Sequence, residues 1–271
     1  MSSAVSNAVA TYRRRMPVSY ERMIENALDW EHLPWLHSGS FTEIRLLDSG
    51  ERYWRASTRL AGSGAESTIE LRLHDDGLGW ATRTLGGMGA GTLIDTRVVL
   101  HAERDLEVEV AFHVPGLESM EDREFVGAFY TALYARLYDE DESMMVERQH
   151  RLDGRTKKST GHELELGPID DLRPRLPLVV ETTRGRFRIF ETGSDLFAHA
   201  TLCPHWLGPL EACPIEEFDG RAEIRCPWHG YRFDPVSGKS TEGRSLRLAR
   251  APEVAVENGT AKLRWVDGSS A

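Results

Sequence analysis

Two short cysteine–histidine pairs constrain this chain more than any other feature. The string CPH occupies residues 203–205 and the string CPWH occupies residues 226–229, with 20 residues between them. Thiolates and neutral imidazoles suit zinc and iron–sulfur centres alike, so the residue types alone leave both open. The chain has 3 cysteines, and two of them lie in these pairs, so a disulfide framework is not expected. This cysteine usage favours a reducing compartment and predicts a cytoplasmic protein.

The residues around both pairs favour an iron–sulfur cluster. Residues 202–210 read LCPHWLGPL, and residues 226–234 read CPWHGYRFD, followed by Ser237-Gly238. These strings closely resemble the two cluster loops of Rieske proteins. The resemblance implies a [2Fe-2S] cluster in which two cysteines hold one iron and two histidines hold the other. A zinc knuckle remains the alternative. The implied ligands are Cys203, Cys226, His205 and His229.

Two departures from the Rieske pattern matter. The family usually has glycine two residues after the first histidine, and this chain has Leu207, so that loop must turn without the usual flexible residue. High-potential respiratory members carry an inter-loop disulfide that needs a cysteine where Trp228 stands. The chain therefore resembles the ferredoxin and oxygenase branch, which receives electrons from a nicotinamide-linked reductase. Cys213 is expected to be a buried small hydrophobic residue instead of a ligand.

A second metal site is predicted near the N-terminus. Helical periodicity runs from Val18 to Asp29, and Pro34 is expected to end that helix at or just before Leu33. His32 and His37 flank this proline, so the break lets both imidazoles turn toward one point. Two histidines and one carboxylate form the facial triad of non-haem iron oxygenases. Two histidines near a helix end can also be surface or hydrogen-bonded residues without a metal.

The string around these histidines supports the metal-site interpretation. Residues 25–37 read ENALDWEHLPWLH, which resembles the signature of Rieske non-haem iron oxygenases. On that resemblance, His32 and His37 ligate a mononuclear Fe(II). Asp29 is the carboxylate that links a cluster histidine to this iron, and Asn26 belongs to the same catalytic group.

The third iron ligand is expected on a late helix of the same domain. Residues 138–149, YDEDESMMVERQ, resemble the family segment that supplies it. Asp141 follows Leu133 and Leu137 in steps of four, on the predicted inward stripe, so we choose Asp141. Glu142 competes, because alignment from the following residues shifts the match by one. An acidic solvated turn is the alternative without a metal.

The periodicity along the chain predicts an α+β protein of two domains. Alternating apolar residues predict strands at 67–73, 93–100 and 106–113, followed by a helix at 121–150 whose apolar stripe includes Phe125 and Phe129. This pattern predicts an N-terminal helix-grip (START-like) domain at 1–152, a polar linker at 153–162 and an all-β Rieske domain at 163–271. The order is reversed relative to most oxygenase subunits. Residues 1–17 are expected to be a solvated start or a weak transit peptide.

These features together predict an oxidoreductase. The formal net charge of -10 argues against nucleic-acid binding, and no apolar run is long enough to span a membrane. The resemblance implies a mono- or dioxygenase that hydroxylates, dihydroxylates or dealkylates a small apolar or aromatic molecule with O2. Its electrons would come from NAD(P)H through a reductase, with or without a ferredoxin, and the family forms trimers. The alternatives are an electron-transfer or ligand-binding protein without a second iron, and a structural zinc protein.

Overall fold

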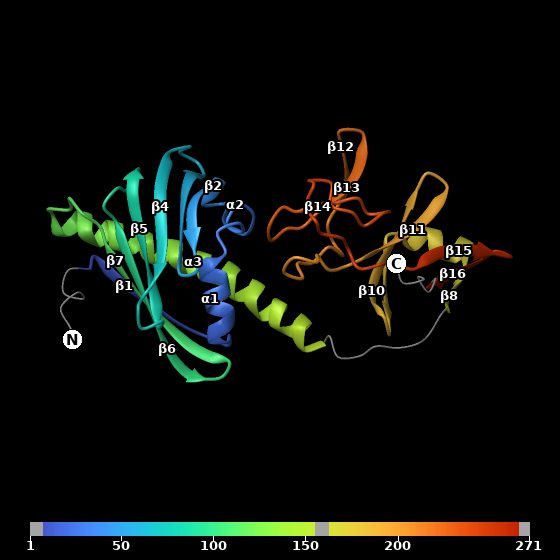
Figure 1. Cartoon of the computed structure of the whole chain (residues 1–271), viewed down its shortest axis with the longest axis horizontal. Coiled ribbons are helices and arrows are strands. Elements are labelled where there is room, and N and C mark those ends of the chain that lie inside the picture. Colours follow the sequence, from blue (N-terminus) through green and yellow to red (C-terminus); the bar gives the residue numbers. More distant parts are fainter. Residues whose placement is uncertain (1–7, 155–162, 266–271) are drawn as a thin grey trace. The chain divides into compact units, whose positions relative to one another are not determined.

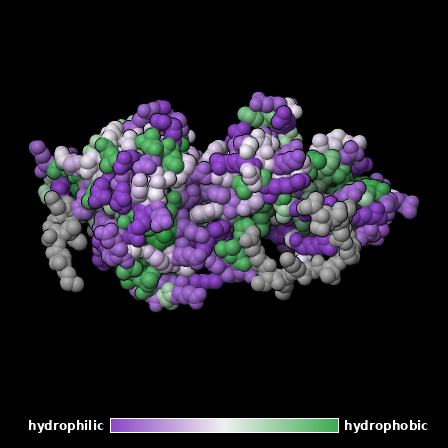
Figure 2. Space-filling view, in the orientation of Figure 1, coloured by the Kyte–Doolittle hydropathy of each residue, from purple (hydrophilic) through white to green (hydrophobic). Residues whose placement is uncertain are grey.

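The computed structural model describes residues 8–154 and 163–265 (Figure 1). The chain divides into two compact units, Met1–Gln149 and His150–Ala271. Most of the predicted linker lies outside the described residues, so the boundaries at 152 and 163 stay predictions. In Figure 2, hydrophilic residues are interspersed with smaller apolar patches on the visible face of both units.

The N-terminal unit is built on one antiparallel seven-stranded sheet, in the order β1-β7-β6-β5-β4-β3-β2. Strand β7 realises the predicted alternation, because Leu106, Val108, Val110 and Phe112 are all fully buried. The predicted antiparallel sheet is confirmed. The strands are β1 (Ala10–Met16), β2 (Phe41–Gly50), β3 (Tyr53–Leu60), β4 (Glu66–Leu73), β5 (Gly79–Gly87), β6 (Leu93–Ala102) and β7 (Asp105–His113).

Helix α3 (Met120–Asp153) packs along this sheet, as the helix-grip prediction requires (Figure 1). Tyr130 stacks on Phe112 of β7 with ring centroids 5.3 Å apart, and Tyr134 contacts the same ring edge to face at 5.0 Å. At Gly127 the helix approaches β1 so closely that a Cβ atom would lie 2.8 Å from the carbonyl oxygen of Val9. A glycine is therefore needed at this contact.

The predicted apolar stripe of this helix is wrong at its N-terminal end. Phe125 is 75% exposed and Phe129 is 58% exposed. The inward face instead runs from Tyr130 through Tyr134 to the buried Tyr138. Both sets repeat every four residues, so periodicity alone could not choose between them.

The prediction of a solvated start is wrong for residues 10–16, because they form strand β1 of the sheet. Each residue of β1 pairs with β7, from Ala10 opposite Phe112 to Met16 opposite Leu106. The side chain of Arg14 points toward helix α3, where it forms ion pairs with Asp139 and Glu142 at 2.5 and 2.7 Å. Residues 1–7 lie outside the described part of the chain.

Two helices cross from β1 at one sheet edge to β2 at the other. Helix α1 (Tyr20–Leu28) begins after its N-cap Ser19 and ends before Asp29, earlier than predicted. Helix α2 (Leu33–Leu36) then carries Pro34 in its first turn. Proline is favoured there because the first helical N–H groups have no intrahelical acceptor. Pro34 therefore helps to start a second helix instead of ending the first.

The C-terminal unit consists of three small antiparallel sheets, as predicted for an all-β domain. It also contains a cis peptide bond between Leu176 and Pro177. The first sheet has β9 (Leu178–Thr182), β10 (Gly185–Thr192) and β11 (Asp195–Ala200), and the second has β12 (Ile215–Phe218), β13 (Arg221–Arg225) and β14 (Arg232–Phe233). The third has β8 (Glu163–Pro168), β15 (Glu253–Glu257) and β16 (Thr260–Arg264), with α4 (Ile169–Leu172) and the 3-10 turn Arg173–Arg175 beside it.

Candidate functional site

The two cysteine–histidine loops bring their four predicted ligands together in the C-terminal unit. Cys203 and Cys226 are free, buried thiols that hydrogen-bond to each other. The rings of His205 and His229 lie edge to face, with centroids 4.4 Å apart. Two thiols and two imidazoles from separate loops therefore share one small volume.

Both loops use the same backbone turn. The N–H of Leu207 donates to the carbonyl oxygen of Cys203 at 3.0 Å, and the N–H of Gly230 donates to that of Cys226 at 2.8 Å. Leu207 and Gly230 both have positive φ angles, of 65° and 69°. The expectation that the first loop turns without the usual glycine at residue 207 is confirmed, and Leu207 carries the backbone strain.

The surroundings of Cys226 favour a thiolate. Its pKa is lowered to about 5 by the hydrogen bond from Cys203, by the side chain of His229 and by backbone N–H groups, although burial opposes this. A Cβ atom at Gly208 would lie 2.6 Å from Cys226 Sγ. The first loop can therefore pass over this sulfur only with glycine at that position.

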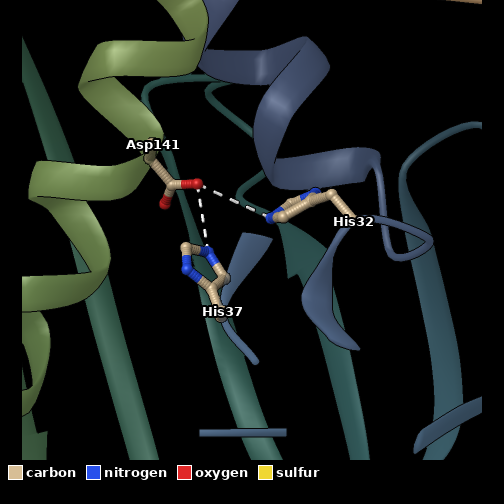
Figure 3. Close-up of side chains that lie close together, drawn as sticks. All are labelled: His32, His37 and Asp141. Atoms are coloured by element: carbon tan, nitrogen blue, oxygen red, sulfur yellow. Dashed lines mark ion pairs between the residues drawn. The ribbon is translucent and has the colours of Figure 1, made fainter. Parts of the chain in front are cut away.

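The N-terminal unit gathers a second group of potential metal ligands (Figure 3). His32 and His37 come from the ends of α2, and Asp141 comes from α3. Asp141 Oδ1 lies 3.1 Å from His37 Nε2 and 3.6 Å from His32 Nε2. All three side chains are buried, and their ligand atoms lie within 4.8 Å of one another. Within the described residues this is the only group of three or more ligand atoms that all lie within 4.8 Å of one another.

Glu142 lies outside this group, because it pairs with Arg14 at 2.7 Å. Asp141 instead accepts a hydrogen bond from Asn26 Nδ2 at 2.9 Å. The imidazolium form of His37 and the Asn26 amide lower the pKa of Asp141, although burial would raise it. The helix therefore directs Asp141, and not Glu142, toward the two histidines.

The far nitrogens of both imidazoles face further carboxylates. His32 Nδ1 lies 3.3 Å from Asp29 Oδ2, and His37 Nδ1 lies 2.6 Å from Glu140 Oε2. Burial lowers the pKa of His37, but Asp141 and Glu140 outweigh it and raise the pKa overall. The carboxylate of Glu140, hydrogen-bonded to His37 Nδ1, fixes the tautomer and orientation of that ring, as in many metal sites. Asp29 lies against the His32 ring. Sequence reasoning missed Glu140, because nothing in the acidic run 139–142 marks it as a histidine partner.

A cavity of about 130 Å³ adjoins the two histidines and Asp141. Its apolar wall includes Trp54, Trp80 and Leu71, and Trp54 Nε1 already donates to the carbonyl of Ala27 at 2.9 Å. The indole of Trp54 therefore offers the cavity mainly its apolar surface. A larger depression of about 810 Å³ in the C-terminal unit borders none of the predicted ligands.

Comparison with known proteins decides what the C-terminal unit is. The family model of the Rieske [2Fe-2S] domain matches residues 162–252. These residues form a Rieske domain. It lies in the C-terminal part of the chain, after the helix-grip unit, so the predicted domain order is confirmed.

The Rieske domain also has a curated relative. A human Rieske domain-containing protein is 32% identical over 74 residues, which are 27% of this chain and 47% of that protein. The match thus spans about half the length of that relative. A Rieske domain supports a [2Fe-2S] cluster, and the buried thiols and adjacent imidazoles fit such a group.

Several solved structures resemble parts of this chain. The Zhui aromatase/cyclase from Streptomyces sp. R1128 has a TM-score of 0.44 at 14% identity, covering 54% of this chain and 96% of its own. The quaternary ammonium Rieske monooxygenase CntA has a TM-score of 0.40 at 11% identity, covering 54% and 39%. The ferredoxin of carbazole 1,9a-dioxygenase from Nocardioides aromaticivorans IC177 has a TM-score of 0.32 at 23% identity, covering 38% and 98%. At these values the likeness decides neither activity nor substrate.

Two further predictions concern the burial of Cys213 and the apolar length of the helices. Cys213 is partly rather than fully buried, its thiol donates to the carbonyl of Pro209 at 3.2 Å, and burial raises its pKa to about 11. Among the described helices, none is long and apolar enough to cross a bilayer.

We predict that Leu207→Gly is more stable than Leu207→Ala. Both variants lose the packing of a side chain that is only 4% exposed, which costs about 2–5 kcal/mol. Only glycine also relieves the left-handed conformation, which is worth about 1 kcal/mol. The measurement is the urea midpoint at which the visible cluster absorption disappears. Equal midpoints, or a lower one for glycine, would refute backbone strain at Leu207.

Proposed function

We propose that this protein is the oxygenase component of a Rieske system, with the [2Fe-2S] cluster held by Cys203, Cys226, His205 and His229. The convergence of His32, His37 and Asp141 beside a cavity, in a chain that also has a Rieske domain, carries this proposal. A passive ligand-binding cup has no need of three buried ionisable side chains at one point.

The side-chain distances support a mononuclear iron at this point. Two atoms about 2.1 Å from one ion lie about 3 Å apart when they are neighbours in an octahedron. The distance of 3.1 Å from Asp141 to His37 is close to this value, and the distance of 3.6 Å from Asp141 to His32 is about 0.6 Å longer. Bound there, ferrous iron would supply the oxygen chemistry, because two histidines and one carboxylate leave coordination positions open.

The surrounding residues prepare the three ligands. Asn26 hydrogen-bonds to Asp141, which fixes the carboxylate rotamer, and Glu140 holds the His37 ring. Asp29 lies against His32 and is the proposed carboxylate between a cluster histidine and the iron site. The tryptophans of the cavity wall place apolar surface beside the three ligands.

The cavity supports a small, uncharged, apolar substrate. A cavity of about 150 Å³ lined by apolar side chains accommodates benzene, so about 130 Å³ suits one ring. No Lys or Arg lines this cavity, so a carboxylate substrate would lack a countercharge. Hydroxylation would convert RH, O2, two electrons and two protons into ROH and water. The electrons would come from NAD(P)H through a reductase, with or without a ferredoxin.

Single-turnover oxidation tests this proposal. The protein is loaded with iron, its cluster is reduced, the reductant is removed, and O2 is added with toluene or with naphthalene as the larger control. We expect toluene to accelerate cluster reoxidation and to yield hydroxylated toluene, and naphthalene to do neither. Reoxidation that no small apolar molecule accelerates would favour the electron-transfer alternative.

We predict that Glu140→Gln weakens iron binding at the mononuclear site by about 10–100-fold. Glutamine keeps the size of the side chain but removes the charge that orients and polarises His37. Ferrous-ion titration of the iron-free site measures the effect. Asp139→Asn is the matched control, because Asp139 pairs with Arg14 and should leave the iron affinity unchanged. Equal losses in both variants would exclude a specific role for Glu140.

A further inference from the structure

The N-terminal half of α3 presents an apolar face to solvent that the proposed oxygenase activity does not use. We call this surface the outward face of α3. Its residues lie on the opposite side of the helix from Tyr130, Tyr134 and Tyr138, which pack on the sheet. All are exposed, and the two phenylalanines are 75% and 58% exposed. The outward face consists of Glu121, Phe125, Ala128, Phe129, Ala132 and Arg136.

The order of residues on the outward face is complementary to itself in the antiparallel direction. Two copies of α3 can pair in antiparallel directions about a two-fold axis that passes between Ala128 and Phe129. In this register the residue numbers of two facing residues always add up to 257. Phe125 then lies opposite Ala132, and Phe129 opposite Ala128. A large side chain meets a small one at each of these positions, which lets two helices pack closely.

The charges of the outward face agree with the same register. Glu121 lies opposite Arg136 of the second copy, and the two-fold axis makes this ion pair twice. Asp139, one turn further along, is already paired with Arg14 of its own chain. Arg136 Nη2 donates to Ser40 Oγ of its own chain at 2.8 Å, so Glu121 of the second copy meets the other nitrogens of that guanidinium. In a parallel pair each residue would instead face the same residue of the second copy. Glu121 would then face Glu121, Arg136 would face Arg136, and each phenylalanine would face its equivalent.

We propose that two copies of this chain associate through the outward face of α3, antiparallel and about this two-fold axis. Four phenylalanine side chains become buried, and because they are only 75% and 58% exposed beforehand, each contributes less than the about 150–250 Å² of a fully buried aromatic side chain. The buried area is at or below the lower limit of stable interfaces, about 1,200 Å², so the association depends on concentration. The dimer is therefore a reversible one.

Sedimentation velocity over a concentration series, on the protein with its cluster intact, tests the interface. We expect a reversible monomer–dimer equilibrium at low salt. Phe125→Lys should weaken it at least about 100-fold, because the substitution removes two buried rings per dimer. Val99→Lys is the matched control, since Val99 is 49% exposed on β6, and it should leave the equilibrium unchanged. An unchanged visible spectrum and circular dichroism verify folding of each variant.

Charge reversal tests the antiparallel register. Glu121→Arg and Arg136→Glu should each weaken association about three- to tenfold, and the double variant should recover it to within about twofold. A monomer at every concentration overturns the proposal. A dimer or trimer that persists in Phe125→Lys also overturns it, because the outward face is then not the interface. Failure of the double reversal to recover association contradicts the two-fold pairing.

Discussion

Replacing Asp141 with Asn is expected to abolish mononuclear iron binding and oxygenation while the Rieske cluster remains. Asparagine has nearly the same shape, so it can keep the contact with Asn26 and preserve the fold. It removes the one carboxylate that faces both histidines, and a neutral amide is a much weaker ligand for Fe(II). Loss of an outer partner already costs 10–100-fold, so we expect more than about 100-fold here. Ferrous-ion titration and product analysis measure it.

Glu142→Gln is the control for this prediction. Glu142 is the neighbour that sequence alignment could not exclude, and it pairs with Arg14 away from the histidines. Its variant should keep iron affinity and turnover near those of the unmodified protein. If Glu142→Gln lost the iron and Asp141→Asn kept it, the assignment of the third ligand would be wrong.

Replacing Cys226 with Ser is expected to eliminate the cluster and all reductase-dependent activity. The thiol is 1% exposed and lies against Cys203, so an alcohol at this position cannot bind iron with comparable strength. The visible absorption and the electron paramagnetic resonance signal of the reduced cluster should both disappear. The iron site of the N-terminal unit should still bind one Fe(II), because its ligands come from other elements.

Cys213→Ser provides the matched control. Cys213 donates to a backbone carbonyl and lies outside the four-residue group, so serine should keep that hydrogen bond and the cluster. A normal spectrum is expected. Loss of the cluster in this variant, or its retention in Cys226→Ser, would contradict the proposed ligand set.

The sequence indicates most members of both ligand groups through short spacings, whereas Asp141 comes from the distant helix α3. The Rieske loops are local strings, and His32 and His37 lie at the two ends of one short helix. The positive φ angle of Leu207 agrees with the sequence as well, because leucine stands where the family usually has glycine, the residue that tolerates this conformation. Local geometry of this kind is encoded within a few residues.

Other features depended on tertiary contacts. The sequence predicted the wrong inward face for the first half of α3. Tyr130, Tyr134 and Tyr138 repeat with the same period as the predicted stripe, so the spacing could not distinguish the two faces. Asp141 nevertheless lies beside the two histidines, since it follows Leu137 by four residues and both line the same cavity. Glu140 and strand β1 could not be found, since their partners lie about 100 residues away in sequence.

The central claim is that one chain holds two different iron centres. The most direct test is iron and acid-labile sulfide analysis of the anaerobically purified protein, combined with Mössbauer spectroscopy. We expect three irons for every two sulfides, with one iron present as high-spin Fe(II) outside the cluster. Two irons for every two sulfides, after incubation with excess Fe(II) and removal of unbound metal, would contradict the mononuclear site and leave an electron-transfer protein with a binding cavity.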